Sequence, residues 1–255
     1  MFISLKKALV FAAAASICLF AAGCGNSSDS ASSSSSKDAN KEITVGVTPG
    51  FHADVMEQVK KEAAKQGILI KVIEFSDYVT PDVALSNKEI DMNSYQHKPY
   101  MDNMVKDKGL KLVSIGQTVV APIGLYSHKI KSLDELKDGA VVAIPNDPTN
   151  GARGLLLLQK AGLIKVKDGV KYPTPADVAE NPKHLQFREL EAAQIPRSLD
   201  DVDLAAVNTN YALEAGIDPV KDALFREDKD SPYANIIAVH EDDKDNPTYK
   251  KIVEI

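Results

Sequence analysis

The residues best suited to bind a small charged molecule stand at the start of a strongly marked helix. Asp147 and Pro148 suit the N-cap and the first position of a helix that continues to Lys160. Asn150 and Arg153 are three residues apart, so they share one face of its opening turns. Free N–H groups at a helix N-terminus and a planar guanidinium both suit a carboxylate. The cluster predicts a site for a small carboxylate; the alternative is a surface arginine paired with a neighbouring acid.

Three of the eight tyrosines lie close together in the sequence. Tyr78, Tyr95 and Tyr100 each stand at a predicted junction between a strand and a helix, and His97 lies among them. The carboxyl ends of parallel strands form the ligand-binding edge of an open α/β sheet. These side chains are therefore candidates for one binding wall. Their alternative role is to cover the edge of the sheet as amphipathic core residues.

Two asparagines adjoin apolar runs that we predict to be strands. Asn208 directly follows residues 204–207, and Asn235 leads into residues 236–239. An amide both donates and accepts hydrogen bonds, so it can meet either an ammonium or a carboxylate group. The alternative, and the commoner use of asparagine, is a helix cap or a turn.

The spacing of apolar residues predicts alternating strands and helices along the chain. In the first half we expect strands at 43–47, 68–75, 90–95 and 110–120, with helices at 55–63, 81–87 and 99–108. After Pro122 we expect strands at 123–127, 140–144, 184–190, 204–207 and 236–239, a helical turn at 133–136 and the helix at 147–160. This alternation is typical of an α/β fold with parallel sheets. Two successive units, each of about 100 residues, predict two lobes.

Composition excludes several classes of protein. Of the 255 residues, 44% are hydrophobic and 26% are charged, which favours a packed soluble core. A net charge of −6 argues against a nucleic-acid binder. Both cysteines, Cys18 and Cys24, lie near the start, so we expect no disulfide framework, cysteine-rich zinc site or cysteine nucleophile in the body. No two of the five histidines have metal-ligand spacing, so no metal is expected.

The first residues are typical of a targeting segment. Lys6 and Lys7 precede an apolar run at 8–22 that is short for crossing a bilayer. The run ends in small residues directly before Cys24, which resembles the lipobox of bacterial lipoproteins. We predict a signal peptide over 1–23 and a lipidated Cys24. An ordinary cleavage site with an incidental cysteine is the alternative.

Residues 24–42 predict a flexible tether behind that cysteine. Residues 26–40 include eight serines and no large apolar side chain, so nothing there offsets the entropy of ordering. The chain is net negative and would be repelled by anionic lipid. We therefore expect the lipid, and not a basic patch, to hold the protein at the extracytoplasmic face of a cell membrane.

Six stretches of the sequence together resemble the NlpA/MetQ-like methionine-binding lipoproteins. They cover nearly all of the chain after the tether, at 45–52, 75–85, 91–100, 144–153, 207–212 and 231–237. The sequence departs from the family pattern at Phe51, at Asp82, where Asn is usual, and in the run 91–95. The resemblance also implies a chain that continues beyond Ile255 into the rest of a terminal helix.

The resemblance implies a two-lobed periplasmic-binding-protein-like fold of type II with a ligand cleft between the lobes. We expect lobe 1 to comprise residues 43–121 and 236–255, and lobe 2 residues 122–235. The implied function is that of a substrate-binding protein of an ABC importer, which takes L- and also D-methionine and delivers it to the permease and ATPase complex. Methionine-containing dipeptides or another amino acid are alternative ligands. No cofactor and no nucleic acid are implied.

The resemblance also assigns roles to particular residues. Arg153 would bind the ligand carboxylate, and three amides would orient its α-amino and carboxylate groups: Asn150, Asn208 and Asn235. Four side chains would form the pocket for the ligand side chain: Tyr78, Tyr95, His97 and Tyr100. A polarizable thioether packs well against aromatic edges, which suits methionine.

Two other classes of protein remain open. An exported enzyme on the same fold would need a nucleophile with a base, or a pair of carboxylates, among these clusters. The clusters contain no such combination. A metal-binding importer component would use His97, but the histidine and acidic companions of a metal site are absent from its surroundings in the sequence.

Overall fold

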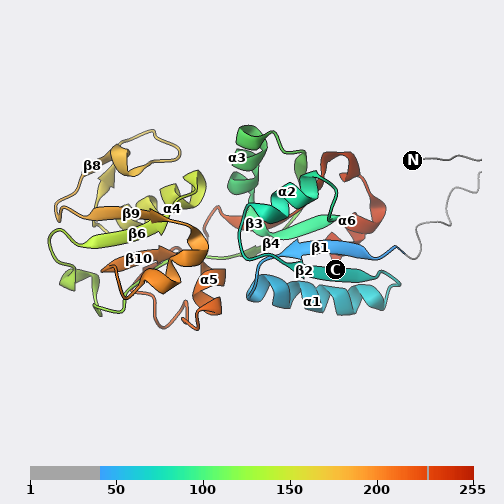
Figure 1. Ribbon diagram of the computed structural model, residues 1–255, viewed down its shortest axis with the longest axis horizontal. Coiled ribbons are helices and arrows are strands. Elements are labelled where there is room, and N and C mark those ends of the chain that lie inside the picture. Colours follow the sequence, from blue (N-terminus) through green and yellow to red (C-terminus); the bar gives the residue numbers. More distant parts are fainter. Residues whose placement is uncertain (1–40, 229) are drawn as a thin grey trace, which may run out of the picture. The chain divides into compact units, whose positions relative to one another are not determined.

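The computed structural model describes residues 41–228 and 230–255. The predicted signal peptide, the lipidated Cys24 and the tether up to residue 40 lie outside the described residues. The described chain builds two five-stranded sheets and a small two-stranded one (Figure 1).

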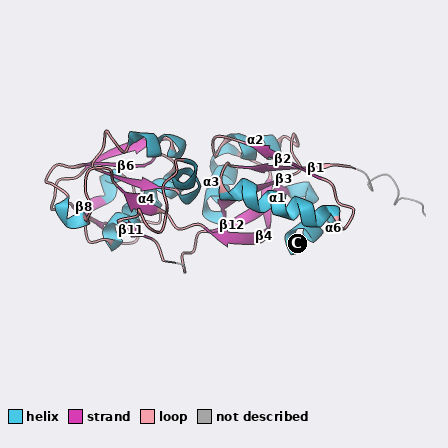
Figure 2. Cartoon of the chain, turned by 90° about the horizontal axis from the view of Figure 1, so that it is seen from below, coloured by secondary structure: helices cyan, strands magenta, loops and turns pink. Residues whose placement is uncertain are grey.

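The first sheet has the strand order β2-β1-β3-β12-β4. Its strands are β1 (Ile43–Val47), β2 (Ile70–Glu74), β3 (Met92–His97), β4 (Leu112–Val120) and β12 (Ala234–His240). The helices packed with it are α1 (Phe51–Ala64), α2 (Thr80–Ser86), α3 (Lys98–Lys108) and α6 (Pro247–Glu254). Residues of α1 and α6 share one apolar cluster with the sheet and residues of α2 and α3 share another, so both faces are covered (Figure 2).

The second sheet has the strand order β11-β5-β10-β6-β9. Its strands are β5 (Gly124–Tyr126), β6 (Val141–Pro145), β9 (Gln186–Leu190), β10 (Leu204–Val207) and β11 (Phe225–Arg226). Its helices are α4 (Pro148–Lys160) and α5 (Thr209–Glu214), and β7 (Lys165–Val166) pairs with β8 (Val178–Glu180) beside it. Short 3-10 helices occupy Leu133–Glu135, Pro175–Asp177, Ala192–Gln194, Pro196–Ser198 and Glu241–Asp243.

Both large sheets are mixed, which corrects the expectation of parallel sheets. In the first sheet β1 runs parallel to β2 and β3, but β12 is antiparallel to β3 and β4. In the second, β5 is antiparallel to β10 and β11. The cause lies in the path of the chain, which leaves the first sheet after β4 and returns from β11 to insert β12 between β3 and β4. Strand–helix alternation in the sequence does not reveal such a late insertion.

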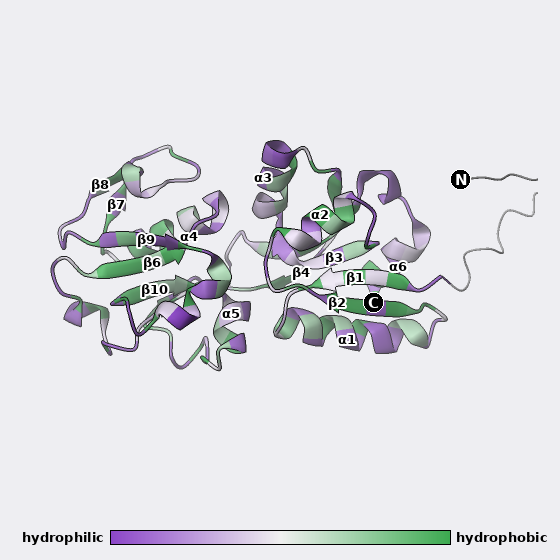
Figure 3. Cartoon of the chain, in the orientation of Figure 1, coloured by the Kyte–Doolittle hydropathy of each residue, from purple (hydrophilic) through white to green (hydrophobic). Residues whose placement is uncertain are grey.

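Most strands of the core are apolar runs of the sequence, but strand β3 differs from them in a way that bears on function. Strands β6 and β10 are strongly hydrophobic and buried (Figure 3). All six residues of β3 are also buried, yet the strand contains Asn93, Ser94, Gln96 and His97. Buried polar side chains need hydrogen-bond partners. The carboxyl end of β3 therefore marks a polar region inside the first sheet.

The predicted start of α4 is confirmed. The Asp147 side chain accepts hydrogen bonds from the backbone N–H groups of Thr149 (3.1 Å) and Asn150 (2.9 Å), as an N-cap does. A Cβ atom on Gly151 would lie 2.7 Å from the carbonyl oxygen of Pro145, so α4 packs too closely on the end of β6 for any other residue. The helix start is thus fixed against the sheet.

Candidate ligand-binding site

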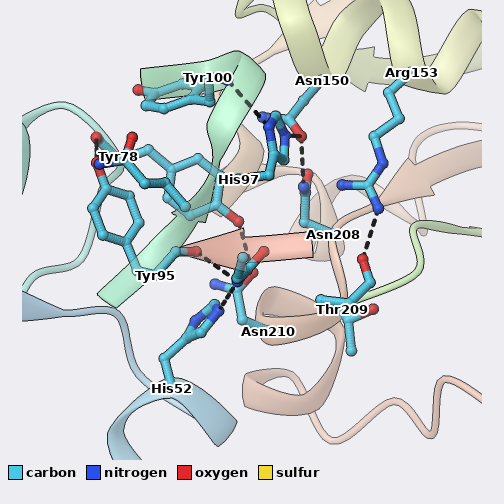
Figure 4. A pocket seen from close by; sticks show the side chains of 13 residues that line it. His52, Tyr78, Tyr95, His97, Tyr100, Asn150, Arg153, Asn208, Thr209 and Asn210 are labelled. Atoms are coloured by element: carbon cyan, nitrogen blue, oxygen red, sulfur yellow. Dashed lines mark hydrogen bonds between the residues drawn. The ribbon is translucent and has the colours of Figure 1, made fainter. Parts of the chain in front are cut away.

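One pocket is lined by residues of both large sheets and of the segments that adjoin their strands (Figure 4). The space between its side chains, with the solvent-facing mouth included, measures about 340 Å³. The structure brings all eight predicted site residues to its wall: Tyr78, Tyr95, His97, Tyr100, Asn150, Arg153, Asn208 and Asn235. Five further residues also line it: His52, Gln96, Ala121, Thr209 and Asn210.

Arg153 is buried and already holds a partner. Its Nε donates to Glu227 Oε1 (2.7 Å), and its Nη2 donates to Glu227 Oε2 (2.5 Å) and to the carbonyl oxygen of Ala121 (2.7 Å). The Tyr233 ring stacks on the guanidinium, 4.5 Å from its central carbon. A buried guanidinium needs a counter-charge. The two-pronged edge that we expected to face a ligand therefore meets Glu227.

The remaining nitrogen of Arg153 is the one available to a ligand. Among the described residues no hydrogen bond is made by Nη1, and the guanidinium extends towards Asn208 across the site (Figure 4). The Arg153 side chain is only 3% exposed, so this nitrogen acts in a largely water-free setting. Charge-assisted hydrogen bonds are strong in such a setting.

A neutral hydrogen-bond network joins the two sheets at His97. The backbone N–H of Tyr100 donates to His97 Nδ1 (3.1 Å), so the proton is on Nε2, which lies 3.1 Å from Asn150 Oδ1. Asn208 Nδ2 donates to the same oxygen (3.0 Å). Burial lowers the pKa of His97 to about 3, which keeps the imidazole neutral at physiological pH. His97 is the last residue of β3 in the first sheet, and Asn150 lies in α4 directly after β6 of the second, so this contact spans the pocket.

Asn208 presents a hydrogen-bond acceptor that has no partner. Its Oδ1 is buried, and among the described residues nothing donates to it. An unpaired buried acceptor costs roughly 1–3 kcal/mol. Since Asn208 lines the pocket, a donor on a ligand would remove this cost. An ammonium group is such a donor.

The aromatic wall centres on Tyr78. Its ring lies 5.7 Å from Tyr95, 5.9 Å from Tyr100 and 5.0 Å from Tyr211, measured between ring centroids. The Tyr95 hydroxyl donates to the carbonyl oxygen of Tyr78 (2.5 Å), and the Tyr78 hydroxyl donates to Asn210 Oδ1 (2.6 Å). Burial raises the pKa of both hydroxyls, so both rings are neutral. The wall thus presents aromatic surface on which the hydroxyls of Tyr78 and Tyr95 are already bonded.

Asn235 was predicted as a site residue, whereas His52, its partner in the structure, was not. Asn235 Nδ2 donates to His52 Nε2 (2.6 Å) and to the carbonyl oxygen of Tyr95 (2.9 Å), while His52 Nδ1 lies 2.7 Å from Thr48 Oγ1. Burial lowers the pKa of His52 to about 3. Its position could have indicated this role, because His52 stands in the first turn of α1, shortly after the carboxyl end of β1. Asn210, two residues after Asn208 in the same polar stretch, also lines the pocket but was not predicted as a site residue.

A buried carboxyl group stands directly behind the pocket wall. Asp82 Oδ1 accepts hydrogen bonds from Asn93 Nδ2 (2.8 Å) and from Nε2 of the pocket residue Gln96 (2.5 Å). Burial raises the pKa of Asp82 to about 7, although these amide bonds act in the opposite direction. Asp82 Oδ2 and Gln96 Oε1 are buried without a partner among the described residues. Asp82 was noticed in the sequence only as a departure from Asn.

The lining of this pocket consists of amides, tyrosines, histidines, one arginine, one threonine and one alanine. The pocket-lining side chains include no serine, cysteine or carboxylate, and the Thr209 hydroxyl donates to the carbonyl oxygen of Pro122. Within the described residues no three histidine, cysteine or acidic side chains are grouped to hold a metal ion. No described helix has the length and apolar character needed to cross a membrane.

Two α/β lobes with a polar and aromatic pocket lined from both define the class of periplasmic substrate-binding proteins. More narrowly, the chain belongs to the NlpA lipoprotein family, whose sequence model matches residues 43–255. It is 54% identical over 237 residues to the D-methionine-binding lipoprotein MetQ of Salmonella typhi, covering 91% of this chain and 84% of that protein. It is 55% identical over 222 residues to the protein of the same name from Escherichia coli K12, covering 86% and 82%.

Solved structures agree with the fold. The crystal structure of a methionine-binding protein, MetQ, superposes with a TM-score of 0.82 at 55% identity, covering 84% of this chain and 89% of that one. A nutrient-binding protein from Burkholderia cenocepacia bound to methionine gives 0.81 at 50% identity, covering 84% and 90%. The expected family and the two-lobed fold are therefore confirmed.

Proposed function

We propose that this chain is the lipid-anchored substrate-binding protein of an ABC importer. It binds methionine, in the L form and also the D form, between its two lobes and delivers it to the permease and ATPase complex. The observation that carries this proposal is the pairing of one free Arg153 nitrogen with one unpaired acceptor, Asn208 Oδ1, in the same pocket. A positive donor beside a neutral acceptor is the pattern that an amino-acid zwitterion requires.

The rest of the pocket fits a methionine side chain. With the carboxylate on Arg153 and the ammonium on Asn208, the side chain extends towards the wall formed by Tyr78, Tyr95 and Tyr100. A thioether is polarizable and makes favourable contacts with aromatic rings. The names of the relatives support this choice of ligand.

The protein acts by binding alone and performs no reaction on the ligand. The pocket-lining side chains supply donors, acceptors and aromatic surface, but no nucleophile with a base. Both pocket histidines have strongly lowered pKa values and keep their ring nitrogens in hydrogen bonds. They are suited to orient their neighbours and not to transfer protons near neutral pH.

Calorimetric titration of the purified chain with a panel of ligands tests this function. We expect binding of L-methionine and D-methionine, weaker binding of alanine and glycine, and none of zinc. Tighter binding of a methionine dipeptide than of either free form would move the function to peptide uptake. Binding of zinc without methionine would contradict the proposal.

Shortening the aromatic wall should change selectivity. Tyr100→Ala is expected to weaken methionine binding by about 1–3 kcal/mol, because only a long side chain reaches this ring. Alanine and glycine should lose much less. Tyr172→Ala makes the same chemical change at a ring that packs against Lys171 away from the pocket, and it should leave all three affinities unchanged. Equal losses for methionine, alanine and glycine in Tyr100→Ala would place this tyrosine in the core only.

The lipid anchor can be tested with the two cysteines. Cys24→Ala should abolish lipidation and move the protein from the membrane fraction to the soluble fraction. Cys18→Ala, within the signal peptide, is the matched control and should leave the protein at the membrane. A Cys24→Ala protein that stays in the membrane fraction after high-salt and carbonate washes would contradict the anchor.

A further inference from the structure

The pocket contains one permanent positive charge, and that charge is already balanced. Arg153 and Glu227 form a two-pronged ion pair with N–O distances of 2.7 and 2.5 Å, and their side chains are only 3% and 13% exposed. Ion pairs of this geometry are strong when they are shielded from water. The pair as a whole is neutral, although one nitrogen of Arg153 remains available to a ligand.

Glu227 is held in place independently of Arg153. Its Oε2 accepts a hydrogen bond from the backbone N–H of Ile123 (3.2 Å) and another from the Ser231 hydroxyl (3.2 Å). These residues belong to the two segments that connect the sheets, the first after β4 and the second after β11. Glu227 is therefore fixed by both connections and is not free to swing away when a ligand approaches Arg153.

The remaining side chains of the pocket do not change this balance. His52 and His97 are neutral, and the other lining residues are amides, tyrosines, Thr209 and Ala121. The charge of Asp147 acts on Tyr78, but this carboxylate accepts hydrogen bonds from the first turn of α4. It therefore faces the positive end of that helix, which offsets its charge. The side chains that line the pocket therefore carry a net charge of zero once Glu227 is counted with Arg153. Asp82, with a pKa of about 7, stands behind this lining and is bound to Gln96, so its charge is present whichever ligand binds.

We propose that Glu227 is a specificity-determining residue, which restricts the pocket to ligands that carry an ammonium group together with their carboxylate. The inference rests on the proposed function and deepens it. A lone carboxylate on Arg153 Nη1 would share one guanidinium with the Glu227 carboxylate, so two negative charges would face one positive charge. A zwitterion brings its own compensating charge and keeps the site neutral.

The discrimination arises from repulsion across the guanidinium. Two like charges a few ångströms apart interact strongly when water is largely excluded. Placing an unfavourable charge against the wrong ligand is a general route to specificity. A binding protein built this way rejects carboxylic acids with the same side chain but no amino group. Sequence reasoning had no access to this pair, because Glu227 is separated from Arg153 by 74 positions.

The test compares three ligands on three full-length chains by calorimetric titration. The ligands are methionine, its desamino analogue γ-(methylthio)butyrate, which lacks the ammonium, and methioninol, which lacks the carboxylate. The chains are wild type, Glu227→Gln, and Asp228→Asn as a matched control. Asp228 is the next residue and pairs with Lys160 at the surface, so its variant makes the same charge change away from the pocket.

We expect wild type to bind methionine more tightly than either analogue. In Glu227→Gln the preference for methionine over the desamino analogue should shrink by on the order of tenfold or more, because the pocket gains a positive charge. Methioninol should lose further affinity relative to methionine. Asp228→Asn should keep the wild-type ratios. A residue with only a structural role would weaken all three ligands together and leave the ratios unchanged, which would overturn the inference.

Other outcomes are also decisive. If Glu227→Gln does not fold, the affinities of the wild-type protein still test the inference. Equal affinity for methionine and its desamino analogue would contradict a charge-balanced pocket. If wild type ignores methionine but binds leucine, the proposed ligand is wrong, and the same comparison with leucine and its desamino analogue decides the role of Glu227. Binding of the carboxylic acids in preference to the amino acids would refute both.

Discussion

Replacing Arg153 by alanine is expected to weaken methionine binding about 30- to 4,000-fold, or about 2–5 kcal/mol. The variant removes the nitrogen that meets the ligand carboxylate, and a buried carboxylate without a partner is strongly unfavourable. It also leaves Glu227 facing that carboxylate with no positive charge between them. Calorimetric titration of methionine into wild type and variant measures the loss, with circular dichroism as the control for folding.

The structure adds a cost in stability that the sequence did not predict. Arg153 contributes to the fold as well as to the site, because it is the buried partner of Glu227. Removing one member of a buried pair destabilises a protein by about 3–5 kcal/mol. Adding Glu227→Gln to Arg153→Ala should restore part of the stability and none of the affinity. Arg153→Lys should rescue only part of both, because lysine lacks the planar fork.

This prediction has a clear opposite. A folded Arg153→Ala protein that binds methionine within about threefold of wild type, less than about 0.7 kcal/mol, would remove Arg153 from the site. The ligand carboxylate would then have to be sought on Asn208 or Asn235.

The stability of the protein against unfolding is expected to rise steeply with pH on the acid side and to peak near pH 6.5. His52 and His97 each have a pKa lowered from 6.5 to about 3 by burial, so their contribution is present above pH 6.5 and lost as the pH falls towards 3. Asp82 has a pKa raised from 3.8 to about 7, so its contribution is present below pH 3.8 and lost as the pH rises through 7.

The two histidines and Asp82 change the stability of the protein in opposite directions, and they do so over different ranges of pH. Between pH 3.8 and 6.5 the unfolded chain binds two histidine protons that the folded chain lacks, and the folded chain binds one carboxyl proton that the unfolded chain lacks. The net difference of one proton makes stability rise with pH by about 1.4 kcal/mol per unit. Above 6.5 only Asp82 still titrates, and stability should fall slightly.

Asp82→Asn separates these contributions. Without this carboxyl group, the free energy of unfolding should rise about twice as steeply between pH 3.8 and 6.5. Its fall above pH 6.5 should disappear. Urea unfolding across this range measures both, with Asp228→Asn as a control whose profile should match wild type. A wild-type profile that is flat below pH 6.5 would contradict the buried neutral state of the two histidines.

Local features of the fold were predictable from the sequence, and the order of the strands was not. The N-cap at Asp147, the helix end at Gly109 and the strands Ile43–Val47 and Leu204–Val207 follow from nearby residues, and the structure has them as predicted. The antiparallel insertion of β12 depends on contacts between distant parts of the chain. The short α5 was missed because it holds too few residues for a helical period to emerge.

The residues of the candidate site also differ in how far the sequence could predict them. Asn150, Arg153 and Asn208 were predicted because they stand at helix starts or strand ends, where α/β folds place their ligands, and the structure has all three in the pocket wall. Glu227 was not found, because it matters only through a partner far away in the sequence. Asp82 was visible as an unusual residue, but its raised pKa depends on complete burial.

The most direct test of the account is a crystal structure of this chain, made with ordinary methionine, in complex with selenomethionine as the ligand. We expect one strong anomalous selenium peak beside Tyr78, Tyr95 and Tyr100. We also expect the ligand carboxylate on Arg153 Nη1 and the ammonium on Asn208 Oδ1, with Glu227 still bound to the other edge of the guanidinium. A selenium peak outside this pocket, or a ligand carboxylate that displaces Glu227 from Arg153, would contradict this mode of binding.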